Sequence, residues 1–166
     1  MGKKLLIKNA AELVTCRGKA PKSGEAMADI GIINDGAMWI EDGVIRRVGT
    51  TDEVLSGIDA AEAEVLDAAG RCVLPGFVDP HTHFLFAGNR AEEFSWRLRG
   101  DTYMQIMERG GGIVNSVRAT REATKEELTK VGWQRLCSML SFGVTTVEGK
   151  SGYGLDAATE IKQLET

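Results

Sequence analysis

After residue 71 the sequence alternates between strand-like and helix-like segments, and this alternation sets the fold class. Residues 72–83 form a short apolar stretch bounded by glycine and proline, which is typical of a buried strand with polar groups at its carboxyl end. Residues 124–142 combine a capping-box pattern, Thr124 to Glu127, with an apolar stripe at helical spacing. Residues 144–148 predict a second strand, and Asp156 begins another helical pattern. This order predicts a parallel α/β architecture.

The chain length limits how much of such an architecture can be present. A closed (β/α)₈ barrel takes about 250 residues, whereas this chain has 166. We therefore expect residues 71–166 to be the start of a barrel, with its first two or so βα units, truncated at Thr166. The connection after the first strand is long and polar, and it predicts one short helix, capped by Asp101 and ended by Gly110–Gly112.

Residues 1–70 predict a small, partial β domain. Lys4–Cys16 reads as one or two strands broken near Asn9, and residues 17–28 read as a solvated loop. The strongest local signal is a hairpin in which Asp42-Gly43 joins residues 38–41 to residues 44–48. Asp-Gly accepts the positive φ angles that a two-residue hairpin turn requires.

Composition and charge exclude several classes of protein. With 20 Lys and Arg against 24 Asp and Glu, the net charge is −4, so a basic nucleic-acid surface is not expected. The hydrophobic fraction of 43% suits a folded chain, and no apolar run approaches the length of a membrane span. The N-terminus reaches Lys8 and Asn9 before an apolar signal region develops, and the three cysteines are widely spaced. These features predict a cytoplasmic protein.

Both histidines of the chain stand at the end of the first predicted barrel strand, in Pro80-His81-Thr82-His83. Residues i and i+2 of a strand project from the same face, so the two imidazoles can converge on one point. Imidazole is a ligand for zinc and iron, and the carboxyl ends of barrel strands form the functional face. His81 and His83 are therefore predicted metal ligands. A catalytic zinc needs at least three protein ligands, and the spacing of Asp79, Glu148 and the cysteines singles out none of them.

Two glycine-rich segments do not fit nucleotide-binding motifs. Gly149-Lys150-Ser151 resembles the end of a phosphate-binding loop, but the required first glycine would fall on Val144. Gly110-Gly111-Gly112 lacks dinucleotide-motif spacing and follows a predicted helix. It is read either as a flexible loop near the strand ends or as a helix stop.

Three further side chains can reach the same face. Arg90 follows His83 by seven residues, and a guanidinium there could bind a substrate carboxylate through two hydrogen bonds, although an isolated loop arginine is usually solvated. Tyr153 follows the second strand and could present its hydroxyl to the cavity, whereas Tyr103 could equally belong to the core.

These segments together resemble a known family. The first barrel strand with its His-x-His motif is similar to that of the amidohydrolase superfamily. More selectively, the chain resembles imidazolonepropionases, hydrolases of histidine degradation, in four segments: Phe86-Ala87-Gly88-Asn89-Arg90, Gly110-Gly111-Gly112-Ile113, Ala119-Thr120-Arg121 and the run from Gly143 to Leu155 that contains Glu148-Gly149-Lys150-Ser151-Gly152-Tyr153-Gly154.

The resemblance implies a function, and it implies that this chain supplies only some of the residues of the active site. It implies hydrolysis of the ring amide of 4-imidazolone-5-propanoate to N-formimino-L-glutamate, with water activated by one zinc or iron ion held in part by His81 and His83. Arg90, Tyr153 and Tyr103 would bind the substrate, and residues 1–70 would belong to a small β-sandwich domain. The remaining metal ligands and the acid/base groups are expected beyond Thr166, so the chain would be an N-terminal fragment without turnover of its own. No nucleic-acid or membrane partner is implied, and a homodimeric full-length enzyme is compatible with the resemblance.

Other functions remain open at this point. Another amidohydrolase, such as a guanine-deaminase-like enzyme or a cyclic-amide hydrolase, would keep the two histidines but give no role to Arg90 with Tyr153. A non-catalytic truncation product would have neither turnover nor stoichiometric metal.

Overall fold

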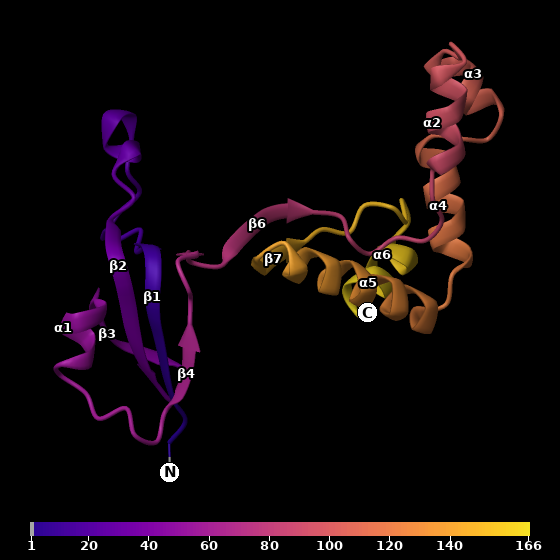
Figure 1. Ribbon diagram of the computed structural model, residues 1–166. Coiled ribbons are helices and arrows are strands. Elements are labelled where there is room, and N and C mark those ends of the chain that lie inside the picture. Colours follow the sequence, from indigo (N-terminus) through magenta and orange to yellow (C-terminus); the bar gives the residue numbers. More distant parts are fainter. Residues whose placement is uncertain (1) are drawn as a thin grey trace. The chain divides into compact units, whose positions relative to one another are not determined.

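The computed structural model describes residues 2–166, which divide into two compact units (Figure 1). The first unit ends at Pro75 and the second runs from Gly76 to Thr166. The sequence places this boundary earlier, after residue 70. The difference arises because Cys72 and Val73 pair with the first strand of the first unit.

The first unit is a five-stranded mixed sheet, in the order β3-β2-β1-β4 with β5 also paired to β1. β1 is antiparallel to β2 and parallel to β4 and β5. A core formed by Leu6, Ala37, Trp39 and Val54 joins the sheet to the short helix α1. The bounds are β1 Lys4–Val14, the 3₁₀ turn η1 Gly24–Ala28, β2 Ile32–Glu41, β3 Val44–Thr50, α1 Thr51–Leu55, β4 Glu64–Asp67 and β5 Cys72–Val73.

Local signals in the first unit act as predicted. The hairpin turn has positive φ at both Asp42 (50°) and Gly43 (77°), so the expected Asp-Gly hairpin is confirmed. The predicted break near Asn9 is an irregularity inside one continuous strand: Asn9 has φ 56°, and the register with β2 shifts between Ile7 and Ala10.

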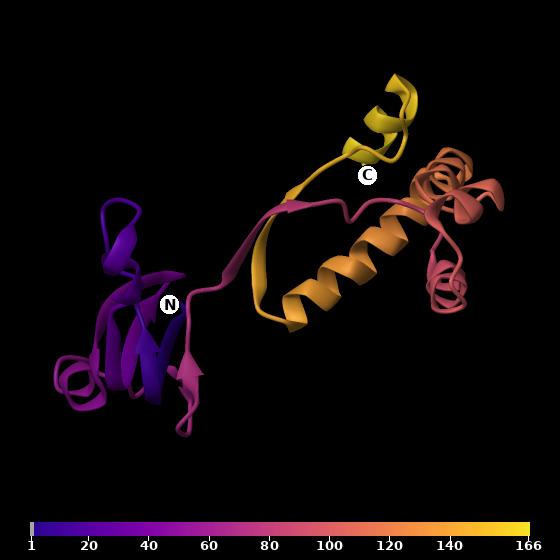
Figure 2. The same cartoon turned by 90° about the horizontal axis from the view of Figure 1, so that it is seen from above.

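The second unit is built around a parallel pair of strands, β6 (Phe77–Thr82) and β7 (Val144–Gly149). Four helices lie between these strands in the chain, and α5 returns the chain to the start of β7 (Figures 1 and 2). The helices are α2 Ala91–Leu98, α3 Tyr103–Glu108, α4 Ile113–Glu122, α5 Lys125–Ser141 and, after β7, α6 Ala157–Leu164. The chain is therefore a mixed α/β protein, while the partial barrel stays a prediction.

Two helix starts confirm the sequence reading. The Thr124 hydroxyl accepts the N–H of Glu127, the Glu127 carboxylate accepts the N–H of Thr124, and α5 follows. Asp156 caps α6 by accepting the N–H of Thr159 at 2.8 Å.

Three expectations were wrong. Residues 72–83 are two strands rather than one, because Pro75 lacks the N–H that would continue a ladder between them. α3 is capped by Thr102 rather than Asp101, whose carboxylate instead pairs with Arg109. The connection after β6 holds two further helices, α2 and α4, where the sequence predicts only one short helix. No helix formed by residues 2–166 is both long and apolar enough to cross a bilayer.

Candidate metal and substrate site

The two histidines lie at the carboxyl end of β6, where the strand is irregular. Asp79 faces Val147 and Thr82 faces Gly149, so β6 has one residue more than β7 between these pairs. The extra residue falls at Pro80-His81, and Asp79 supports it by accepting the N–H of His81 at 3.1 Å. Pairing continues past the bulge through the N–H of Lys150, which donates to the Thr82 carbonyl at 2.8 Å.

The imidazoles of His81 and His83 lie side by side. Their ring centroids are 5.3 Å apart and the rings are inclined at 63°. His81 is exposed and His83 is half-buried. The structure thus brings together the two side chains that the His-Thr-His spacing predicts on one face.

The residues present fit part of a metal site. Imidazole nitrogens are suitable donors for zinc and iron, and the buried Nδ1 atom of His83 has no hydrogen-bond partner among residues 2–166. Glu148 lies near His81, but its carboxylate accepts a hydrogen bond from Lys150. This hydrogen bond lowers the pKa of Glu148, and the nearby His81 lowers it by a smaller amount. Within the part of the chain that the structure describes, no group of three or more His, Cys, Asp or Glu side chains is arranged to hold a metal ion.

Aromatic contacts connect Tyr153 to the histidines. The Tyr153 ring stands edge-on to His83 at 5.5 Å between centroids and lies 4.9 Å from Phe86. The Arg135 guanidinium covers the Phe86 ring, with Cζ 3.8 Å from its centroid, and donates to the Phe84 and Phe86 carbonyls. Burial lowers the pKa of Arg135, and the nearby Tyr153 phenol opposes that shift. Arg135 therefore ties α5 to the segment after His83.

Arg90 is held by a buried carboxylate. Glu93 accepts two hydrogen bonds from Arg90 through one oxygen, from Nε at 2.9 Å and Nη2 at 2.6 Å. Its other oxygen accepts the Gly112 N–H at 2.7 Å. The hydrogen bonds to Glu93 raise the pKa of Arg90, and those from Arg90 lower the pKa of Glu93 against the effect of burial. The glycine run Gly110–Gly112 is thus linked to Arg90 through Glu93.

Tyr103 lies in the same region as Arg90 but on the surface. It is the first residue of α3 and is 54% exposed, so the core alternative for this side chain is wrong. The phenols of Tyr103 and Tyr153 both contribute to the raised pKa of Arg90, behind the larger effects of Glu93 and burial. A pocket of about 240 Å³ adjoins the arginine and is lined by Arg90, Glu93, Phe94 and Arg97.

Sequence reasoning missed three members of this arrangement. Glu93 follows Arg90 by three residues, so a helix over residues 91–98 would have indicated the pair. Arg135 and Phe86 are 49 residues apart in the sequence, and no local sequence pattern predicts their contact.

Comparison with known proteins defines the class of this chain. Residues 64–133 match the model of the amidohydrolase family. The chain is 58% identical over 161 residues to the imidazolonepropionase of Parabacteroides distasonis, and 55% identical over 160 residues to that of Clostridium tetani. These matches cover 97% and 96% of this chain, but 39% and 38% of those proteins. Residues 64–133 are therefore similar to the amidohydrolase family. Over nearly its whole length the chain is similar to imidazolonepropionases, and it spans well under half the length of these relatives.

Solved structures support the fold at lower identity. The E. coli guanine deaminase matches 98% of this chain and 32% of its own, with a TM-score of 0.61 and 19% identity. The A. niger ochratoxinase matches 96% of this chain and 28% of its own, with a TM-score of 0.56 and 17% identity. Because both identities are low, these similarities concern the fold alone.

Proposed function

We propose that this chain is part of an imidazolonepropionase, which hydrolyses the ring amide of 4-imidazolone-5-propanoate to N-formimino-L-glutamate in histidine degradation. The observation that carries the proposal is the identity of 50–58% to several imidazolonepropionases, which extends over nearly the whole chain. The adjoining imidazoles of His81 and His83 at a strand end support the same reading.

The finer features of the proposal follow from the same resemblance. Residues 76–166 would be the first βα units of a (β/α)₈ barrel, and the mixed sheet of the first unit would be part of a small β-sandwich. Exposed apolar residues on β6, Phe77 at 53% and Val78 at 63%, support further strands beside this pair in the complete enzyme. The enzyme would be cytoplasmic, act on a small molecule without nucleic-acid or membrane partners, and could assemble as a homodimer.

Some side chains of this chain would bind the metal ion and others would bind the substrate. His81 and His83 would hold one zinc or iron ion together with ligands from elsewhere in the complete enzyme. When bound, such an ion supplies Lewis-acid activation of water and of the amide carbonyl. Arg90 would bind the propanoate carboxylate through the guanidinium edge that Glu93 leaves free. Tyr153 would orient the ring beside His83, and Tyr103 would close the carboxylate end.

A chimera tests this function directly. This chain would replace the matching segment of the Parabacteroides distasonis imidazolonepropionase, and hydrolysis of 4-imidazolone-5-propanoate and deamination of guanine would both be measured. We expect turnover of the imidazolone only, abolished by H81A or H83A. Guanine turnover would favour the deaminase alternative, and a folded, metal-loaded chimera inactive on both substrates would refute the proposal.

A further inference from the structure

The loop that carries Tyr153 is constrained from two sides. It connects the end of β7 at Gly149 to the start of α6 at Ala157. Its backbone is unusual, with positive φ at Gly152 (135°) and at Leu155 (54°). Leu155 has a side chain, and a residue with a Cβ atom adopts this conformation at an energetic cost, so it persists only where the surrounding structure enforces it.

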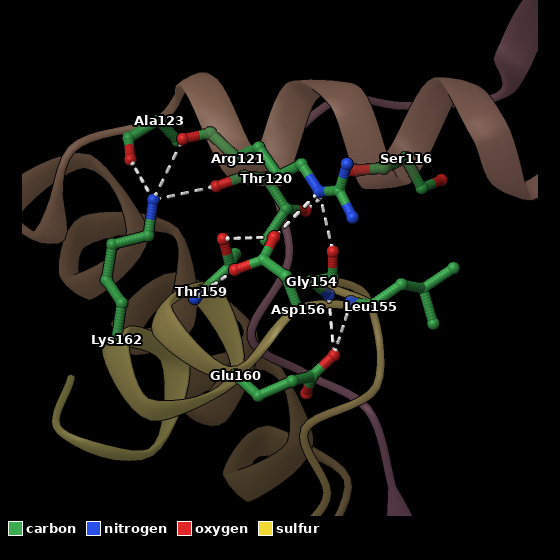
Figure 3. A network of polar contacts seen from close by, with 10 residues as sticks. All are labelled: Ser116, Thr120, Arg121, Ala123, Gly154, Leu155, Asp156, Thr159, Glu160 and Lys162. Carbon is green, nitrogen blue, oxygen red and sulfur yellow. Dashed lines mark hydrogen bonds and ion pairs between the residues drawn. The ribbon is translucent and has the colours of Figure 1, made fainter.

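The first constraint comes from Glu160 on α6. One oxygen of its carboxylate accepts the N–H of Gly154 at 2.8 Å and that of Leu155 at 2.7 Å (Figure 3). Burial raises the pKa of Glu160, but the Ser151 side chain and the N–H groups of Leu155 and Gly154 together lower it by more. The carboxylate is therefore ionised at neutral pH, and charge-assisted hydrogen bonds of this kind are stronger than neutral ones.

The second constraint comes from Arg121 at the end of α4. Its Nε atom donates to the Gly154 carbonyl at 2.7 Å and lies 2.9 Å from the Asp156 carboxylate (Figure 3). Lys162 fixes α6 to the same helix end by donating to the carbonyls of Thr120, Arg121 and Ala123 at 2.7–3.1 Å. Gly154 is therefore held at both its N–H and its carbonyl.

The packing around the loop leaves little space for movement. A Cβ at position 154 would lie 2.7 Å from Cβ of Thr159 and 2.9 Å from the Glu160 nitrogen. A Cβ at position 152 would lie 3.0 Å from Cε1 of His83. Tyr153 lies between these two closely packed glycines, so its backbone position follows from the contacts of its neighbours.

We propose that Glu160 and Arg121 are positioning residues that hold Tyr153 against His83, and that they thereby set how the site receives the substrate ring. The contact with substrate rests on the proposed function, whereas the positioning of Tyr153 does not. Neither side chain contacts the histidines or Tyr153 through a hydrogen bond given by the structure, so both act through Gly154 and its neighbours.

Histidine NMR on this chain tests the positioning without substrate or metal. Because the chain has only two histidines, its imidazole Cε1–Hε1 spectrum has two cross-peaks, which H81A assigns. Y153A defines the shift of the His83 peak when the ring is lost. We expect E160L and R121M to reproduce more than half of that shift. E160Q keeps an oxygen acceptor for Gly154 and Leu155 and should stay near the wild-type position.

Glu165 is exposed and near the end of the same helix, so E165Q should leave the His83 peak unmoved. A His83 peak that stays at the wild-type position in E160L or R121M, each with a wild-type circular dichroism spectrum, would overturn the proposal. If E160L loses that spectrum, R121M decides alone, and a variant of Arg121 that also unfolds would overturn the positioning role in favour of a general structural one.

Kinetics of the chimera then connect positioning to substrate. We expect R121M to raise KM for 4-imidazolone-5-propanoate about tenfold while kcat changes less, since the ring contact is displaced and the metal ligands are not. A tenfold loss in kcat with an unchanged KM would overturn the proposed effect of Arg121 on substrate binding. An inactive wild-type chimera would defeat the proposed function and leave the NMR result intact.

Discussion

At the scale of single residues, the buried carboxylate of Glu93 is the most consequential side chain that the sequence did not reveal. Its side chain is 6% exposed and satisfies both the Arg90 guanidinium and the Gly112 N–H. We expect E93Q to lower the free energy of unfolding by about 1–2 kcal/mol, a value at the low end for charged hydrogen bonds because the Arg90 side chain is 38% exposed. Urea unfolding measures it, and E92Q on the exposed neighbour should change stability little. Equal stability of E93Q and wild type would contradict the buried pair.

The same pair predicts a dependence on pH. Hydrogen bonds from Arg90 hold the pKa of Glu93 below its unfolded value of 4.5. A depressed folded pKa adds stability that is present above the unfolded value and is lost as the pH falls through the folded one. The stability difference between wild type and E93Q should therefore be constant near neutral pH and shrink below about pH 4.5. Unfolding curves from pH 7 to pH 3 test this, and a difference that grows on acidification would exclude it.

At the scale of elements, the sequence predicts turns and helix starts correctly where they depend on contacts between residues close together in the chain. The Asp42-Gly43 turn and the caps of α5 and α6 depend on contacts within three residues, so the sequence contains all the information. The helices that were missed lack such a signal. The N-cap residues of α2 and α4 are Arg90 and Gly112, and neither helix start has a hydrogen bond to an N-cap side chain. Their starts are defined instead by contacts with distant chain, including Glu93 with Gly112.

The same distinction holds for the site. The two-residue spacing of His81 and His83 at the end of β6 predicts neighbouring rings, and the structure places them 5.3 Å apart although β6 is irregular there. Two other contacts join residues that are far apart in the chain: Arg135 with Phe86, and Arg121 with the Gly154 carbonyl. No local sequence pattern predicts contacts of this kind.

The capping box of α5 gives a prediction for this element. T124A removes the hydroxyl that accepts the Glu127 N–H and should cost about 1 kcal/mol of stability. T124S keeps an equivalent oxygen and serves as the matched control, with a change of a few tenths of a kcal/mol. Thermal or urea unfolding followed by circular dichroism measures both. If T124S were as destabilising as T124A, the loss would lie in packing of the methyl group rather than in the cap.

At the scale of the whole molecule, the second unit brings part of a candidate site together and leaves many large apolar side chains exposed. Large apolar side chains of the second unit remain on the outside, among them Trp133 at 69% and Phe142 at 77% exposure. Monomeric proteins seldom leave large contiguous apolar surfaces uncovered, so further chain or a partner could cover such side chains. The chain covers 39% of the length of its Parabacteroides distasonis relative, so under the proposed function further residues of the complete enzyme would complete the metal site.

Metal affinity provides the test at this scale. Complete protein zinc sites are worth about 10–16 kcal/mol, so two of four ligands should give about half, which corresponds to a Kd in the micromolar to submillimolar range. We expect the isolated chain to bind Zn²⁺ this weakly in calorimetric titration, H81A and H83A each to abolish binding, and the chimera to retain one metal per chain through dialysis. C137S, which removes an exposed thiol, is the control and should leave the affinity unchanged. Nanomolar binding by the isolated chain would mean that residues 2–166 complete the site by themselves, and loss of affinity in C137S would place a thiolate in it.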